Sequence, residues 1–262
     1  MLKFSANLSL LFTELSFMDR FEAAKTCGFE AVEIQFPYEL SAEAIQQQLE
    51  QHHLKLVLFN VDAGDLMLGG EGLAAVPEKK DDFKQAVKQA AHYAKILKPE
   101  MINVLAGRCF DDTKKSLYLE TFKENLEYTL SILSPLGVNT VFEAINGYDM
   151  PHFIVDNSPQ MRAIQLAINH PDLLMQYDIY HMHRMGETCA EMIRAYAPYM
   201  GHIQFADSPK RGQPDTGEIN FKELFDAIEQ STYQHWLGAE YNPIGTTQES
   251  LGWYPPAKYK EK

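Results

Sequence analysis

The sequence predicts an α/β protein, a (β/α)8 barrel that spans residues 1–262 as a single domain. Short runs rich in β-branched and aromatic residues alternate with longer helical patterns, which is typical of a parallel barrel. No linker, charge block or low-complexity run divides the chain. The rival fold is an open doubly wound sheet, which would normally carry a glycine-rich phosphate loop after its first strand. The segment "GGEG" at 69–72 does not follow that pattern, so the barrel is favoured.

The expected elements alternate along the whole chain. The strands are expected at 3–9, 31–36, 54–60, 101–107, 139–145, 173–179, 201–206 and 236–241. The helices are expected at 17–27, 41–52, 80–97, 115–133, 158–169, 187–196 and 220–230. Ser41 precedes an acid in the first helical turn, which is typical of a helix start. Gly28 and Gly137 follow expected helix ends, where glycine adopts the left-handed conformation at low cost.

The composition limits the kind of partner. The formal net charge is −13, which disfavours non-specific binding to nucleic acid or to anionic membranes, because both require a basic face. Three widely spaced cysteines argue against a disulfide framework and fit a reducing cytoplasm. Polar residues interrupt the apolar residues of segment 1–17, which makes it a poor signal peptide and too short for a membrane span. We therefore expect a cytoplasmic protein without nucleic-acid or membrane partners.

Two segments outside the regular elements attract attention. Residues 61–78 connect the third strand to its helix and contain four glycines, so they are expected to be either an active-site lid or a surface excursion. Near the C-terminus, Trp253 and Tyr254 precede two prolines. We expect these rings to pack across the barrel or against a second subunit of a homo-oligomer.

Four successive strands carry an oxygen donor inside an apolar run, near the carboxyl end where barrel active sites form. These residues are Glu143 in "VFEAI", Asp178 in "MQYDI", Gln204 in "HIQFA" and Glu240 in "LGAEY". A single acid in a strand is more often half exposed or paired with a base. A buried carboxylate without a partner is costly, and these strands hold few basic residues. Together the four residues predict a shared metal ion.

The donor types indicate which metal. Four oxygen donors suit Mg²⁺ or Mn²⁺ better than Zn²⁺, which favours histidine and cysteine. His181 and His183 follow Asp178, and a His-x-His pair on a strand can also bind zinc. We expect His181 to donate a hydrogen bond to a substrate oxygen, with metal ligation as the alternative. His183 is expected behind the site or at the surface.

Several motifs in order carry a family resemblance: "FSANLSLLFTE", "GFEAVEIQFPY", "LVLFN", "FEA", "YDIYH", "HIQFAD", "GEIN", "GAEY" and "LGWY". Over nearly its whole length the chain resembles the hydroxypyruvate isomerases, which are xylose-isomerase-like TIM barrels. The resemblance implies that Glu143 and Glu240 act as proton donor and acceptor. It also implies that Glu143, Asp178, Gln204 and Glu240 hold the metal. Many sugar epimerase relatives carry histidine where this chain has Gln204, which favours the isomerase branch.

The implied reaction interconverts hydroxypyruvate and 2-hydroxy-3-oxopropanoate through an enediolate, with carboxylates moving the proton. Closely similar enzymes act on the four-carbon 2-oxotetronate, and the sequence does not separate the two substrates. An inosose dehydratase or a sugar 3-epimerase is a rival within the family. Endonuclease IV has the same general fold and belongs to another class. It would need more histidine ligands and a basic rim, which the net charge of −13 argues against.

An anionic substrate in so acidic a protein requires a nearby cation. The loop "ADSPKRGQPD" begins just after Gln204, at the expected catalytic face, and contains Lys210 and Arg211. The planar guanidinium of arginine matches a carboxylate with two hydrogen bonds, whereas lysine offers a point charge. We therefore expect Arg211 to bind the substrate carboxylate, with Lys210 as the second choice.

Overall fold

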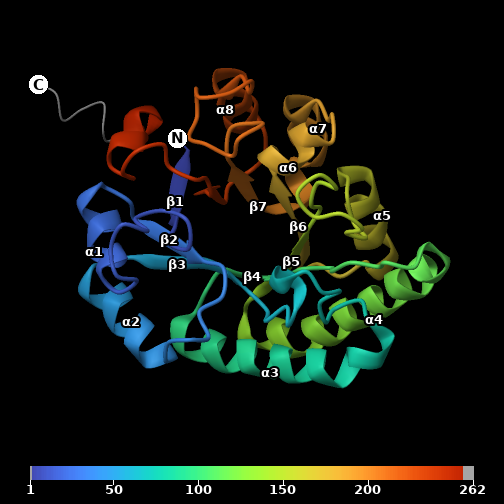
Figure 1. Cartoon of the computed structure of the whole chain (residues 1–262). Coiled ribbons are helices and arrows are strands. Elements are labelled where there is room, and N and C mark those ends of the chain that lie inside the picture. Colours follow the sequence, from blue (N-terminus) through green and yellow to red (C-terminus); the bar gives the residue numbers. More distant parts are fainter. Residues whose placement is uncertain (1, 256–262) are drawn as a thin grey trace, which may run out of the picture.

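A computed structural model describes residues 2–255. Its eight strands form a closed parallel barrel in the order β1 to β8, which confirms the predicted fold class. The strands are β1 (Lys3–Asn7), β2 (Ala31–Ile34), β3 (Lys55–Asn60), β4 (Met101–Val104), β5 (Asn139–Glu143), β6 (Leu173–Asp178), β7 (Met200–Phe205) and β8 (Trp236–Ala239). The helices surround the strands as an outer ring (Figure 1).

The helices agree with the predicted ranges, with one addition. They are α1 (Asp19–Thr26), α2 (Ala42–Gln51), α3 (Lys80–Leu97), α4 (Lys115–Leu133), α5 (Ser158–Ile168), α6 (Ile179–Arg184), α7 (Cys189–Tyr196) and α8 (Phe221–Gln230). The short α6 was not predicted. The Oγ of Ser41 accepts a hydrogen bond from the backbone N–H of Ala44 and so caps α2. Gly28 and Gly137 both have a positive φ after a helical turn, as predicted.

The barrel interior changes from apolar to polar along the strands. An apolar cluster lies near the strand starts, with Ala31 on β2, Met101 on β4 and Trp236 on β8 among its members. Further along, buried polar side chains follow, and the strand register aligns Glu143 with Gln176 and Asp178 with Gln204. The interior therefore gathers its polar groups at the carboxyl ends of the strands.

The aromatic residues near the C-terminus pack against side chains of β1 and β7. The ring of Trp253 meets those of Phe4 and Phe205 edge-on, with centroids 5.3 and 5.0 Å away. Tyr254 stacks on Phe29 at 4.4 Å. Both rings thus pack against other parts of the same chain, which was the first of the two alternatives expected from the sequence. No helix in residues 2–255 combines the length and the apolar character needed to cross a lipid bilayer.

The long connection 61–78 is anchored at both ends. It contains two short 3-10 turns, Leu66–Leu68 and Pro77–Lys79, and buries Ala74, Ala75 and Val76. Its exposed tip carries Leu68 and Met67, and Met67 lines the cavity described below. The connection therefore borders the site, although most of its length is packed.

Candidate active site

A cavity of about 220 Å³ opens at the carboxyl ends of the strands. Its lining includes five of the residues singled out from the sequence: Glu143, His181, Gln204, Arg211 and Glu240. Asp178 lies directly beside it, in contact with His181 and Arg211. The structure therefore brings together all the predicted site residues except Lys210.

Glu143 is the last residue of β5 and is only 5% exposed. Its Oε1 accepts a hydrogen bond of 2.7 Å from the Nδ2 of Asn103 on β4. Burial raises the pKa of Glu143 well above its usual value, and the negative charges of Glu240 and Asp178 raise it further. The hydrogen bond from Asn103 and the positive charge of Arg211 offset this rise in part, and a bound cation or a proton would remove the remaining repulsion.

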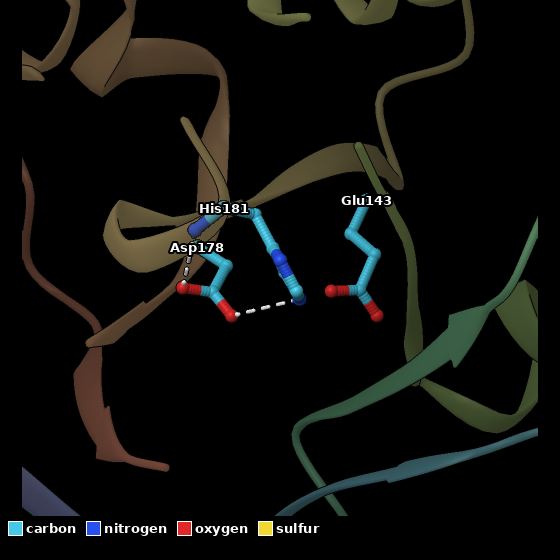
Figure 2. A group of neighbouring side chains, drawn as sticks. All are labelled: Glu143, Asp178 and His181. Atoms are coloured by element: carbon cyan, nitrogen blue, oxygen red, sulfur yellow. Dashed lines mark hydrogen bonds and ion pairs between the residues drawn. The ribbon is translucent and has the colours of Figure 1, made fainter. Parts of the chain in front are cut away.

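Asp178 ends β6 and begins α6. Its Oδ1 accepts hydrogen bonds from the backbone N–H groups of Tyr180 and His181, so it caps the short helix. The cap places His181 one turn away, with its Nε2 3.5 Å from Asp178 Oδ2. Figure 2 shows both side chains from this junction turned toward Glu143 of β5.

Glu240 follows β8 and is likewise 5% exposed. Its Oε1 accepts a hydrogen bond of 2.5 Å from the Nε2 of Gln35, and its Oε2 lies 3.4 Å from the Nη2 of Arg211. Burial raises the pKa of Glu240 to about 7, although the positive charge of Arg211 opposes that rise. A carboxyl group with a pKa near neutrality can both take up and release a proton at physiological pH.

Arg211 projects into the cavity from the loop after β7. Its Nη2 lies 3.7 Å from Asp178 Oδ2, and its guanidinium sits 5.2 Å from the ring centroid of Tyr180. Burial alone would lower the pKa of Arg211, but Glu240 and Asp178 outweigh it and raise that pKa. Arg211 is therefore the cation that faces the acidic site. Lys210 is exposed and does not line the cavity.

A buried carboxylate shapes this arginine loop. Asp207 accepts hydrogen bonds from the backbone N–H groups that return toward it, those of Ser208, Thr216, Gly217 and Ile219. Arg211 itself adopts a left-handed backbone with φ of 57°, and its carbonyl accepts a 2.7 Å hydrogen bond from Asn242 N–H. The loop thus holds its single inward-pointing arginine by backbone geometry.

Gln204 connects the site to a second buried acid that the sequence reasoning missed. Its Nε2 donates to Glu33 Oε1 at 2.8 Å, and its Oε1 accepts from Gln176 at 2.7 Å. Glu33 also receives hydrogen bonds from Ser5, Asn7 and His202. Burial alone would raise the pKa of Glu33, but His202 and these hydrogen bonds outweigh it and lower that pKa. The only sequence signal was the acid in the apolar run "AVEI".

The cluster fits a metal ion. Glu143, Asp178 and His181 each offer one possible ligand atom, and these atoms lie within 4.8 Å of one another. The remaining predicted ligands, Gln204 and Glu240, line the same cavity. Divalent cations favour such buried groups of carboxylates, whose mutual repulsion they remove. The residues present therefore form a possible buried metal site.

Comparison with known proteins identifies the family of the chain. The family model of the xylose isomerase-like TIM barrels matches residues 21–257. The chain belongs to this family. It is 39% identical over 256 residues to the hydroxypyruvate isomerase of Escherichia coli (strain K12), a match that covers 98% of this chain and 99% of the relative. It is 36% identical to the 2-oxo-tetronate isomerase of Pectobacterium atrosepticum, with 97% of each chain covered. The resemblance to the hydroxypyruvate isomerases is confirmed, and the enzyme class is that of an isomerase.

Two solved structures superpose closely on the chain. The chain described as AP endonuclease, family 2, from Brucella melitensis has a TM-score of 0.94 at 35% identity, with 98% of this chain and 99% of that chain covered. The 3-keto-D-glucoside 4-epimerase YcjR from E. coli has a TM-score of 0.82 at 16% identity, over 97% and 98% of the chains. The second likeness supports the fold alone.

Proposed function

We propose that this isomerase interconverts hydroxypyruvate and 2-hydroxy-3-oxopropanoate (tartronate semialdehyde). The observation that carries the proposal is the pair Glu143 and Glu240, which face one cavity from β5 and from the end of β8, beside Arg211. Moving a carbonyl between adjacent carbons requires two proton-transferring groups and a stabilised enediolate. An acidic substrate also requires a cation, which Arg211 supplies.

The reaction moves one carbon-bound proton. One glutamate removes a proton from C3 of hydroxypyruvate. The electron pair of that C–H bond forms the C2–C3 double bond of an enediolate, while the π electrons of the C2 carbonyl move onto its oxygen. A glutamate then delivers a proton to C2, which binds it with the electron pair of the C2–C3 double bond, while the C3 hydroxyl passes its proton to the C2 oxygen and becomes the C3 carbonyl. Glu143 and Glu240 fill these two roles, and either can act first. General acid–base groups of this kind contribute about 10²- to 10⁴-fold in rate.

The proposed metal ligands are Glu143, Asp178, Gln204 and Glu240, with Mg²⁺ or Mn²⁺ as the cation. Oxygen donors and carboxylate charge support this choice over zinc. When bound, such an ion would supply positive charge that stabilises the negative charge of an enediolate. The amide oxygen of Gln204 has two lone pairs, so its hydrogen bond from Gln176 leaves one available.

Arg211 is the proposed carboxylate anchor. Its guanidinium reaches the cavity, packs against Tyr180 and already lies beside two acidic side chains. A substrate carboxylate that enters the cavity would bind the same guanidinium group as these acidic side chains. His181 is proposed to contact a substrate oxygen from the other side of Asp178.

Two other substrate classes are weighed against hydroxypyruvate. The four-carbon 2-oxotetronate is supported by the relatives of that name at 36% identity, and it differs from hydroxypyruvate by one hydroxylated carbon. Abasic DNA is the second alternative, because the Brucella melitensis relative is described as an AP endonuclease. The net charge of −13 and the oxygen-rich donor set weigh against a polyanionic substrate.

We also propose that the protein works in the cytoplasm without nucleic-acid or membrane partners, and that a homo-oligomer is compatible with the fold.

The test uses the purified protein, stripped with EDTA and then reloaded with Mg²⁺ or Mn²⁺. Hydroxypyruvate, 2-oxotetronate, a ketohexose and an abasic-site oligonucleotide would be offered in parallel. Product formation from hydroxypyruvate in ²H₂O, with deuterium appearing on the carbon that receives the proton, is the expected result. Turnover of only the ketohexose or the oligonucleotide would overturn the proposal, and preference for 2-oxotetronate would move it to the four-carbon substrate.

A further inference from the structure

Asn146 holds the ring of His181 from behind. It follows β5 by three residues and is completely buried, and its Nδ2 lies 2.6 Å from His181 Nδ1. His181 is 4% exposed, with its other nitrogen, Nε2, on the side of Asp178 and the cavity. The contact at Nδ1 therefore decides which nitrogen of the ring carries the proton.

The orientation of the Asn146 amide is fixed by the backbone. Its Oδ1 accepts hydrogen bonds from the backbone N–H groups of Tyr148, at 3.1 Å, and Asp149, at 2.9 Å. A flipped amide would place its NH₂ group against these two donors. The NH₂ group must therefore point the other way, where it donates to Asp149 Oδ2 at 3.0 Å and faces His181 Nδ1.

The ring nitrogen that faces an N–H donor must be an acceptor. His181 Nδ1 thus presents its lone pair to Asn146, because a protonated Nδ1 would set two donors against each other at 2.6 Å. With Nδ1 unprotonated, the ring is neutral and its proton lies on Nε2. The Nε2–H group then points toward Asp178 and the cavity.

We propose that Asn146 is a positioning residue that holds His181 as the Nε2–H tautomer, so that His181 donates a hydrogen bond into the cavity and does not ligate the metal. The lone pair that ligation would require is absent from Nε2. The role of the donor rests on the proposed function, in which a substrate oxygen gains negative charge as the enediolate forms. A fixed N–H group aimed at such an oxygen favours the charged state.

Asp149 supports the arrangement from the opposite side. Its Oδ2 accepts from the Asn146 NH₂ group and, at 2.7 Å, from the hydroxyl of Tyr180. One carboxylate oxygen thus receives two donors and keeps the amide in place. This pairing also offers a way to reverse the polarity at His181 without changing the net charge, by exchanging Asn146 and Asp149.

The direct test is the tautomer of His181 in the wild-type protein. Long-range ¹H–¹⁵N correlation spectra of histidine-labelled protein would be recorded with EDTA and with Mg²⁺, which is diamagnetic. His181→Gln identifies the signals of this ring by their loss. The Nε2–H tautomer in both conditions is expected. An Nδ1–H tautomer, or a ring whose Nε2 signal shifts as a metal ligand when Mg²⁺ is added, would overturn the proposal.

The second test exchanges the two side chains in Asn146→Asp/Asp149→Asn. The carboxylate introduced by Asn146→Asp would accept a hydrogen bond from Nδ1, so the tautomer is expected to reverse. Asp149→Asn alone keeps Asn146 and should keep the Nε2–H form. With the donor lost, kcat should fall about 10²-fold while the affinity for Mn²⁺ is not weakened. An unchanged tautomer in the exchanged protein would overturn the role of Asn146. Absence of hydroxypyruvate turnover in the wild type would overturn the proposed function but leave the tautomer result standing.

Discussion

Glu33 and His202 meet inside the barrel with a distance of 2.7 Å between Oε2 and Nε2, and neither side chain is exposed. Glu33 comes from β2 and His202 from β7, and the same carboxylate holds Gln204 of the candidate site. Gly238 leaves room for it, because a Cβ there would lie 2.4 Å from Glu33 Oε2. The polar end of the barrel interior therefore rests on a buried acid whose donors come from the adjacent strand β1 and from β7, which does not pair with β2.

Removal of one member of this pair should destabilise the fold strongly. Glu33→Ala leaves His202, Gln204 and Asn7 without this acceptor, so we expect a loss of about 3 kcal/mol or more in the free energy of unfolding. Urea denaturation of Glu33→Ala, His202→Ala and the double variant measures it. The double variant should lose less than the sum of the single losses. Additive losses would mean that the two side chains act independently.

The fold was predictable because its signals are local. Each strand is a short apolar run, and each ends within a few residues of the predicted boundary, as β5 does at Glu143. The helix α6 was missed because it has only six residues and begins directly at the capping Asp178. The acids at the strand ends could be predicted as site residues for the same reason, because each is a charged residue inside a local apolar run.

The rest of the site depends on contacts that a local pattern does not contain. Glu33 and His202 are 169 positions apart, and nothing in either segment points to the other. Lys210 and Arg211 are neighbours in sequence, yet only the left-handed backbone at Arg211 turns one of them inward. The tautomer of His181 follows from two backbone N–H groups that fix the amide of Asn146. Such features appear only when the strands and loops are placed in space.

Metal removal should abolish most of the isomerase activity. The candidate ligands are carboxylates and an amide, so we expect EDTA to reduce turnover and Mg²⁺ or Mn²⁺ to restore it more fully than Zn²⁺. Metal content would be followed by elemental analysis. Full activity in protein shown to be free of metal would contradict the site. Asp178→Asn serves as the matched variant, since it should require more metal for the same recovery.

Glu240→Gln should separate metal binding from proton transfer. The amide keeps an oxygen donor but cannot act as a base, so we expect turnover of hydroxypyruvate to fall by about 10²-fold or more. Binding of Mn²⁺, measured by electron paramagnetic resonance, should change much less. The exposed Glu249→Gln is the control for a surface carboxylate. Near-normal turnover in the Glu240 variant would remove it from the proton-transfer step.

Glu240→Gln should also change how the free energy of unfolding depends on pH in EDTA-treated protein. Burial raises the pKa of Glu240 to about 7 from 4.5, so its contribution to stability is fully present below pH 4.5 and is lost as the pH rises through 7. Relative to the wild type, Glu240→Gln should therefore gain stability between pH 4.5 and 7, by an amount on the order of 3 kcal/mol. Denaturation midpoints of both proteins across this range measure it. A difference that stays constant with pH would contradict the raised pKa.

Arg211 should discriminate a charged substrate from an uncharged one. Its guanidinium reaches the cavity while Lys210 is exposed, so Arg211→Ala should lower kcat/KM for hydroxypyruvate whereas Lys210→Ala should have little effect. A charge-assisted hydrogen bond is worth about 1.5–3 kcal/mol, which corresponds to a loss of roughly 10- to 150-fold. Arg211→Lys should recover part of this loss, because it restores the charge without the planar fork.

Dihydroxyacetone, which lacks the carboxylate, is the comparison substrate, and its kcat/KM should be nearly unaffected by these substitutions. Equal losses on both substrates would show that Arg211 acts through its contacts with Asp178 and Glu240, which it pairs with at 3.7 and 3.4 Å, and does not bind the carboxylate.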